Sequence, residues 1–92
     1  MIKSFLCPES AALFAGQSVR RFVNIHKVAI RKLRYLNDAV LLSDLKAPPG
    51  NRLEALFGDR AGRHSIRIND QWRICFCWEN GDAYEVEIVD YH

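Results

Sequence analysis

The spacing of apolar residues changes from a helical to a strand-like period between the two halves of the chain. In the first half, apolar side chains recur at steps of 3, 4, 4, 3 and 4 residues along one stripe, formed by Phe22, Ile25, Ala29, Leu33, Leu36 and Val40. That period predicts a helix over about 22–39, because side chains three and four apart share a helix face. Beyond residue 51, apolar and polar residues alternate, as in half-buried strands. Helices followed by neighbouring strands favour an α+β fold.

Three strands are predicted in the second half, at Arg63–Ile68, Trp72–Trp78 and Asp82–Val89, with a weaker fourth at Arg52–Leu56. Upstream, residues 1–5 are predicted to form a short strand, and residues 8–16 a short helix that begins with a proline and an acid. Two prolines and a glycine exclude regular structure from residues 46–51. A chain of 92 residues can hold one core, so residues 1–92 are predicted to form a single domain.

The turns predict which strand residues face each other. A three-residue hairpin loop at 79–81 would place Gly81 where such loops need a left-handed residue. The resulting pairs are Trp72 with Ile88, Ile74 with Val86, and Phe76 with Tyr84. A two-residue loop would bring Glu85 and Glu87 against the apolar face, which disfavours it. The same reasoning at residues 68–71 pairs Ile66 with Trp72 and His64 with Ile74.

The other face of the predicted sheet is polar, and we expect no helix to cover it. It carries Arg63, Ser65, Arg67, Gln71, Arg73, Cys75, Glu85 and Glu87. The three arginines stand on adjacent strands, and the planar fork of arginine suits a phosphate. Alternatively, Arg73 only pairs with Glu87 across the strands, a contact that contributes about 0.2–1 kcal/mol.

An acid, a phenol and an imidazole follow one another at the end of the last strand: Asp90, Tyr91 and His92. Cleavage of an RNA phosphodiester needs one group to take the 2′-hydroxyl proton and another to protonate the leaving 5′-oxygen. It also needs a cation where negative charge gathers on phosphorus. An imidazole titrates near neutral pH and can do either proton transfer. The three residues and the arginines together predict ribonuclease chemistry.

Positive charge is concentrated in and before the predicted second helix. No acid occurs between Glu9 and Asp38, whereas six cations do: Arg20, Arg21, Lys27, Arg31, Lys32 and Arg34. One interpretation is that such a run of positive charge simply marks a helix face exposed to solvent. In a chain whose formal net charge is only +2, it also predicts a surface that binds a polyanion such as nucleic acid.

Other classes of function find no support in the sequence. The three cysteines and three histidines lack the spacing of a zinc site, and no Gly-rich phosphate loop is present. No apolar run approaches the roughly 20 residues of a membrane-spanning helix, and the N-terminus lacks a secretory signal. We therefore expect a cytoplasmic protein with reduced thiols, no metal, no cofactor and no membrane partner. His26 is expected at the surface and His64 partly buried.

Three stretches resemble HigB-type toxins of the RelE superfamily of bacterial toxin–antitoxin systems: MIKSF, GNRLEALFGDRAGRHSIRINDQWRICF and DYH. The resemblance spans essentially the whole chain. It implies two N-terminal helices packed on a curved, mostly antiparallel sheet. It also implies metal-independent endonucleolytic cleavage of mRNA in the ribosomal A site. The implied partners are mRNA, the ribosome with its 16S rRNA, and a HigA-type helix-turn-helix antitoxin.

The resemblance assigns roles to particular residues. Arg73 matches the phosphate-contacting arginine of the family, and residues 90–92 match its C-terminal catalytic group. Arg63 and Arg67 are further candidates for phosphate contacts. The six cations at positions 20, 21, 27, 31, 32 and 34 would dock on rRNA phosphates, a contact that carries no sequence code.

The chain departs from the family pattern at two positions. Glu54 stands where the pattern has a histidine, and Phe57 replaces a basic residue three positions later. Glu54 could act as general base if its pKa were raised, as in other ribonucleases. It could equally be a plain surface acid, which would leave the proton transfers to Tyr91 and His92.

Two other functions stay open. ParE-type relatives share the fold, bind DNA gyrase and cleave nothing, so the fold alone does not separate them from nucleases. The acid–base residues beside Arg73 favour the nuclease, because a gyrase inhibitor needs none. A non-catalytic nucleic-acid-binding module would depend on Arg31 and Arg34 and would tolerate the loss of His92.

Overall fold

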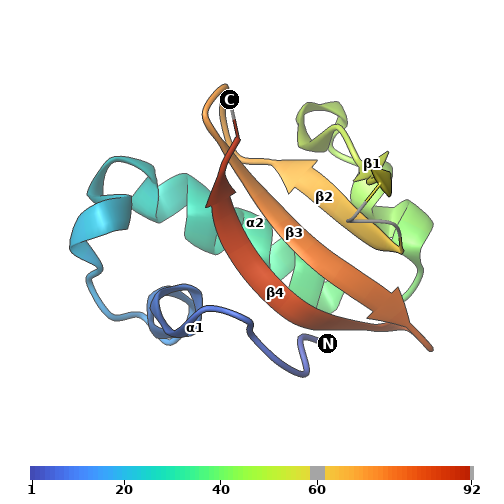
Figure 1. The fold of residues 1–92 in the computed structure, drawn as a ribbon, viewed down its shortest axis with the longest axis horizontal. Coiled ribbons are helices and arrows are strands. Elements are labelled where there is room, and N and C mark those ends of the chain that lie inside the picture. Colours follow the sequence, from blue (N-terminus) through green and yellow to red (C-terminus); the bar gives the residue numbers. More distant parts are fainter. Residues whose placement is uncertain (59–61, 92) are drawn as a thin grey trace.

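Helices precede strands along the chain in the computed structural model, which describes residues 1–58 and 62–91. The helical part comprises α1 (Pro8–Phe14), three 3-10 helices (Arg20–Ile25, Leu42–Lys46 and Pro49–Asn51) and α2 (His26–Asp38). The strands β1 (Glu54–Ala55), β2 (Arg63–Arg67), β3 (Trp72–Glu79) and β4 (Asp82–Asp90) form one antiparallel sheet in the order β1-β2-β3-β4. In Figure 1, α2 crosses one face of this sheet and α1 lies beside β4. The predicted α+β class is confirmed.

The predicted apolar stripe forms the helical side of the core. Phe22, Ile25, Ala29, Leu33 and Leu36 are all buried. The first two precede α2 in a 3-10 helix, so the predicted start of the long helix was wrong. The prediction that Val40 belongs to this stripe was also wrong, because α2 ends at Asp38 and the backbone of Ala39 is extended. The Val40 side chain is consequently 72% exposed.

The hairpin between β3 and β4 differs from the prediction in both its loop and its pairing. The loop has two residues, Asn80 and Gly81, whose φ angles of 52° and 82° suit the turn type that joins twisted strands. With this loop alone, Glu87 would point to the apolar face of the sheet. A β-bulge in β4 returns the apolar residues of this strand to that face. Two residues of β4, Glu85 and Val86, lie between the pairs Cys75–Glu87 and Cys77–Tyr84, where β3 has one.

The bulge corrects the predicted pairs. Ile74 faces Ile88, Trp72 faces Asp90, and Tyr84 faces Cys77 on the polar side of the sheet. Glu85 adopts a φ of 51°, a left-handed conformation that few residues other than glycine take. Val86 and Ile88 therefore both reach the core, where they are buried.

The pairing of β2 with β3 is displaced by two residues from the prediction. Ile66 faces Ile74 and His64 faces Phe76, instead of Trp72 and Ile74. The loop is longer than predicted because the Asn69 side chain accepts hydrogen bonds from the backbone N–H groups of residues 71 and 72. A displacement of two keeps every side chain on its predicted face. His64 is half-buried against the Phe76 ring, as predicted.

The N-terminal segment does not form the predicted strand over residues 1–5. It runs parallel to β4 and contacts it through two isolated bridges, Ile2 with Ala83 and Phe5 with Val86. The predicted strand over 52–56 is reduced to the two residues of β1. Over the described ranges, no helix is long and apolar enough to cross a membrane.

Candidate active site

Arg73 is held in a fixed orientation on the face of the sheet opposite α2. Its Nε donates a hydrogen bond of 2.8 Å to the Ser65 hydroxyl on β2, and its Nη2 donates one of 2.6 Å to the backbone carbonyl of Arg52. The residue is only 8% exposed. These bonds engage Nε and Nη2 of a group that carries five N–H donors in a rigid fork. The guanidinium is therefore a pre-oriented cation.

The alternative in which Arg73 pairs with Glu87 does not occur. The bulge places Glu87 opposite Cys75, and Arg73 faces Val89 on β4. The Glu87 carboxylate instead accepts a hydrogen bond of 3.4 Å from Arg63. Arg73 therefore interacts with Ser65 and with the segment that leads into β1.

The sequence predicted a polar face that nothing covers, but part of this face is covered. Ser65, Arg73 and Cys75 are buried on it. The Arg52 carbonyl reaches Arg73 from the segment that leads into β1, so this segment lies over part of the face. Burial strengthens the electrostatic effect of a cation because less water screens it.

Glu54 lies on β1 opposite Ser65, which brings its carboxylate near Arg73. Its Oε2 is 3.8 Å from Nη2 of Arg73, and its side chain is 53% exposed. A carboxylate that is open to solvent can reach a bound molecule, and such geometry is the first requirement of a general base.

Tyr91, which follows the end of β4, also lies close to Arg73. The centre of its ring lies 5.7 Å from Cζ of Arg73, within the range of a cation–π contact. Two bonds to Gln71 fix this end of the chain: the Tyr91 N–H donates to the Gln71 carbonyl, and the Gln71 side-chain amide donates 3.2 Å to Asp90 Oδ2. His92, the third residue of the predicted catalytic group, lies outside the described residues.

A cavity of about 380 Å³ opens beside these groups. Its lining comprises Glu54, Ala55, Leu56, Phe57 and Tyr91. The Phe57 side chain is 86% exposed at this cavity, an unusual position for a large apolar group. A carboxylate, a phenol and an exposed aromatic ring thus share one opening next to the Arg73 guanidinium.

The three predicted arginines do not converge. Arg67 faces Arg73 directly across β2 and β3, and it pairs with Asp70 in the following turn. Arg63 lies four residues away on β2, about 13 Å along the strand. Its guanidinium is engaged by Glu85 at 3.3 Å and by Glu87 at 3.4 Å. Of these two arginines, Arg67 is the one whose backbone lies directly opposite Arg73.

Five of the six predicted docking cations are exposed, and together they are called the exposed basic surface: Arg20, Arg21, Lys27, Arg31 and Arg34. Lys32 does not belong to it, because it is only 5% exposed and donates a hydrogen bond to Asn51. Burial lowers the pKa of the Lys32 ammonium, and the positive charges of Arg31 and Arg67 lower it further. Arg21 is partly engaged, since it pairs with Glu9 at 2.7 Å and lies over the Phe22 ring.

Sequence reasoning missed the contribution of the segment before β1. Asn51 is fully buried and the Arg52 carbonyl holds Arg73. The prediction that residues 46–51 hold no regular structure was wrong, since Pro49–Asn51 form a 3-10 helix. The one signal was the glycine and proline content, which predicts a turn without saying what the turn contacts.

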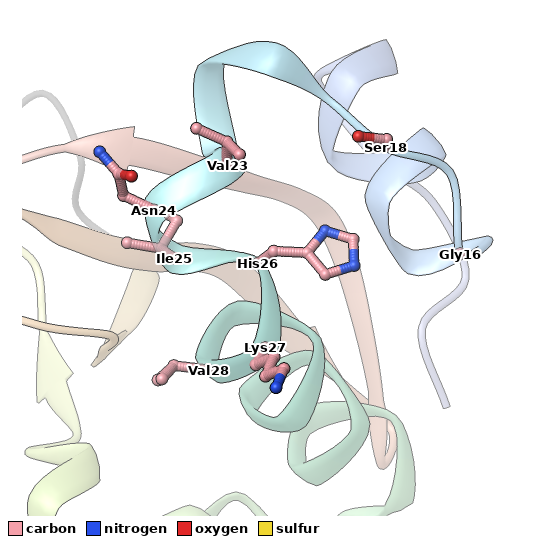
Figure 2. Close-up of a pocket in the computed structure, with 8 residues that line it drawn as sticks. All are labelled: Gly16, Ser18, Val23, Asn24, Ile25, His26, Lys27 and Val28. Atoms are coloured by element: carbon pink, nitrogen blue, oxygen red, sulfur yellow. The ribbon is translucent and has the colours of Figure 1, made fainter.

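A larger cavity, of about 550 Å³, lies apart from this site, between the loop after α1 and the start of α2. Figure 2 shows the His26 imidazole and the Lys27 ammonium at this cavity, with Gly16 and Ser18 on the facing loop. His26 is therefore half-buried at a cavity wall instead of a plain surface residue. None of the residues around Arg73 lines it. Among the residues described, no cluster of three or more His, Cys, Asp or Glu could hold a metal ion.

The fold is that of the RelE-like toxins. It matches a mutant of YafQ from E. coli with a TM-score of 0.60 and 13% identity, over 98% of this chain and 91% of that one. It matches the YoeB–YefM toxin–antitoxin complex from Staphylococcus aureus with a TM-score of 0.58 and 17% identity, over 100% of this chain and 98% of that one. At these identities the likeness concerns the fold alone.

The family model of the HigB-like toxins, the RelE-like toxin of type II toxin–antitoxin system HigB, matches residues 16–92, and the chain belongs to this family. Toxin HigB-1 of Vibrio cholerae is 47% identical over 60 residues, covering 65% of this chain and 63% of that protein. Endoribonuclease HigB of Proteus vulgaris is 49% identical over 41 residues, covering 45% of each. These matches span less than two thirds of either relative.

Proposed function

We propose that the protein is a toxin that cleaves mRNA on the ribosome and so inhibits translation. The observation that carries this proposal is the buried Arg73 guanidinium, fixed by Ser65 and Arg52, with Glu54 and Tyr91 both close to it. A pre-oriented cation beside proton-transfer groups is what phosphodiester cleavage requires. Membership of the HigB family and the similarity to Endoribonuclease HigB support it.

In the proposed reaction, the 2′-oxygen of the RNA attacks the adjacent phosphorus as its proton is removed. The bond from phosphorus to the 5′-oxygen breaks, which leaves a 2′,3′-cyclic phosphate and a 5′-hydroxyl. Glu54 would accept the 2′-hydroxyl proton, and His92 or Tyr91 would donate one to the 5′-oxygen. Glu54 and Tyr91 line the same cavity from β1 and from the end of β4. A base and an acid that act on one phosphodiester both need to reach the same cavity.

Arg73 would stabilise the negative charge on the non-bridging oxygens as the transition state forms. Because Ser65 and Arg52 already orient the guanidinium, little reorganisation is needed at that moment. Arg67, directly across the strands, would contact a neighbouring phosphate in exchange for its exposed partner Asp70. Arg63 would contact RNA only after release from Glu85 and Glu87.

Phe57 would contact a nucleobase. Its ring is almost fully exposed at the cavity that Glu54 and Tyr91 line. A base stacked on an aromatic side chain is stabilised by about 1–3 kcal/mol. Such a contact would help to hold the scissile nucleotide without reading its identity.

The exposed basic surface, which lies on the 3-10 helix Arg20–Ile25 and on α2, would dock on the ribosome. Its cations lie outside the cavity beside Arg73, so docking and cleavage would use separate surfaces. Lysine and arginine contacts to 16S rRNA phosphates give affinity that falls with salt and carries no sequence code. The proposed site of action is the cytoplasm, where ribosomes translate.

We also propose a HigA-type helix-turn-helix antitoxin as the neutralising partner. The family is defined by type II toxin–antitoxin systems, and a YoeB toxin of the same fold was solved together with its antitoxin YefM. The two proteins would form a complex in which cleavage is suppressed.

The proposal is tested with purified protein and ribosomes that carry a short end-labelled mRNA. Cleavage within the A-site codon is expected when that site is empty, and none when tRNA fills it or when ribosomes are omitted. Arg73→Ala should slow cleavage on the order of 100- to 1,000-fold without changing ribosome binding. A folded wild-type protein that leaves every mRNA intact would refute the nuclease, and a supercoiling assay with DNA gyrase would then test the ParE-like alternative.

A further inference from the structure

A buried pair, Lys32 and Asn51, joins α2 to the segment that covers the active site. Lys32 Nζ donates a hydrogen bond to Asn51 Oδ1. The Asn51 amide in turn donates to the backbone carbonyls of Leu45 at 3.2 Å and Ala47 at 3.1 Å. Asn51 has no exposed surface, so both ends of its side chain are held inside the protein.

The pair connects directly to Arg73 along the backbone. Residue 52 follows Asn51, and its carbonyl is the acceptor of the 2.6 Å bond from Arg73 Nη2. Arg52 adopts a φ of 45°, a left-handed conformation that is unfavourable for a residue with a side chain. Such conformations persist where the surrounding structure enforces them. Fixing Asn51 from α2 is one means of enforcing this one.

The pair also lies close to Glu54 along the chain. Glu54 is three residues after Asn51 and enters the sheet opposite Ser65, the residue that holds Arg73 Nε. A shift of the segment before β1 would therefore move the Arg52 carbonyl and the Glu54 carboxylate together. Displacement of reacting groups by about 1 Å can lower a rate by on the order of 100-fold.

Stability alone gives little reason to bury Lys32. Among the described residues, no carboxylate lies within 4.0 Å of its ammonium, and its contacts are Asn51 and, at 6.0 Å, the Tyr35 ring. A buried ammonium without a carboxylate costs free energy that an apolar side chain of similar length would avoid. The charge is better explained by the geometry that it maintains.

We propose that Lys32 and Asn51 are positioning residues, which hold the Arg52 carbonyl and the Glu54 carboxylate against Arg73 and thereby set the rate of RNA cleavage. The inference rests on the proposed function for its effect on rate. It differs from the docking role that the sequence suggested for Lys32. A docking residue would change the ribosome concentration needed for half-maximal cleavage, whereas a positioning residue changes the rate at saturation.

The test compares Lys32→Met and Asn51→Ala with wild type, and uses Lys3→Met as a matched control. Lys3 is exposed and distant in sequence from the site, and methionine resembles lysine in length without its charge. At saturating ribosomes we expect Lys32→Met and Asn51→Ala to cleave 10- to 100-fold more slowly, with half-saturation changed less than twofold. Combining them should slow cleavage no further than the more severe single change. Lys3→Met should match wild type.

A second measurement needs no activity. The N–H group at Arg73 Nε gives its own NMR signal, which should be sharp and protected from exchange in wild type and Lys3→Met. In Lys32→Met and Asn51→Ala, at a temperature where circular dichroism reports full folding, it should shift and exchange at least tenfold faster. An unchanged Arg73 signal and an unchanged saturated rate would overturn the inference. Absence of cleavage by wild type, together with the expected NMR changes, would refute the nuclease but retain the positioning role.

Discussion

The Nε of Arg73 donates a 2.8 Å hydrogen bond to the hydroxyl of Ser65, and both residues are buried on the sheet face away from α2. Serine at this position orients the guanidinium while adding no charge of its own. The Arg52 carbonyl completes the arrangement from a segment outside the sheet. The proposed catalytic cation is therefore oriented by its own protein before any RNA binds.

Substitution of Arg73 should separate charge from geometry. Arg73→Ala is expected to cost about 3–4 kcal/mol of transition-state stabilisation, as for other preorganised donors, or on the order of 100- to 1,000-fold in rate. Arg73→Lys keeps the charge but loses the fork, so we expect it to recover less than tenfold. Single-turnover cleavage on saturating ribosomes measures both. A loss below tenfold in Arg73→Ala would reduce Arg73 to a structural residue.

The C-terminal residues should contribute through their functional groups more than through stability. Tyr91→Phe keeps the ring against Arg73 and removes only the hydroxyl, so it separates packing from proton donation. We expect Tyr91→Phe to slow cleavage less than Tyr91→Ala, and deletion of His92 to abolish it while the thermal midpoint is unchanged. Cleavage rates and circular dichroism of the three variants give the comparison. Normal cleavage without His92 would refute its assignment.

The faces of the sheet could be predicted from the sequence, but the pairing could not. Apolar alternation in β3 indicates which side chains point inward, and Ile74 and Phe76 are indeed buried. The pairing with β4 depended on a bulge at Glu85, a residue whose left-handed conformation no propensity rule anticipates. Without the bulge, the Asn80-Gly81 turn and the apolar face are incompatible. A three-residue loop avoids this conflict without a bulge, but the protein has the two-residue loop and the bulge.

Some parts of the site could not be predicted from the sequence either. Glu54 and Tyr91 could be nominated from their positions in motifs, and the structure places both at Arg73. Lys32 was misassigned because charge in a helix is normally solvated. Its burial depends on Asn51, which lies 19 residues away in a segment without periodicity. Contacts of this kind arise from tertiary packing and leave no local pattern.

Phe57 should affect substrate binding more than chemistry. Its exposed ring at the cavity makes no proton transfer, so Phe57→Ala should raise the half-saturating mRNA–ribosome concentration while the saturated rate changes less than threefold. Stacking energies of about 1–3 kcal/mol correspond to an effect on the order of 5- to 150-fold. Phe57→Tyr retains an aromatic surface and should behave as wild type. Equal defects in both variants would exclude stacking.

The bulge predicts a difference in stability between two substitutions of Glu85. Both Glu85→Ala and Glu85→Gly lose the ion pair with Arg63, but only alanine retains a Cβ in the left-handed conformation. That Cβ costs roughly 1–2 kcal/mol. Glycine has more freedom in the unfolded chain, which offsets part of the gain. We expect Glu85→Gly to be the more stable by about 1 kcal/mol in urea denaturation, and equal stabilities would mean that the bulge relaxes.

Stability should depend on pH through His64. Burial lowers the pKa of its imidazole below the ordinary value of 6.5, so near that pH the unfolded chain binds more protons than the folded one. The free energy of unfolding therefore rises with pH through this range, and the contribution of His64 is complete above 6.5 and lost as the pH falls towards the folded pKa. His64→Phe keeps a ring against Phe76 and cannot titrate. Urea denaturation between pH 5.5 and 7.5 should give a smaller slope with pH for His64→Phe than for wild type, and identical slopes would assign the dependence to other groups.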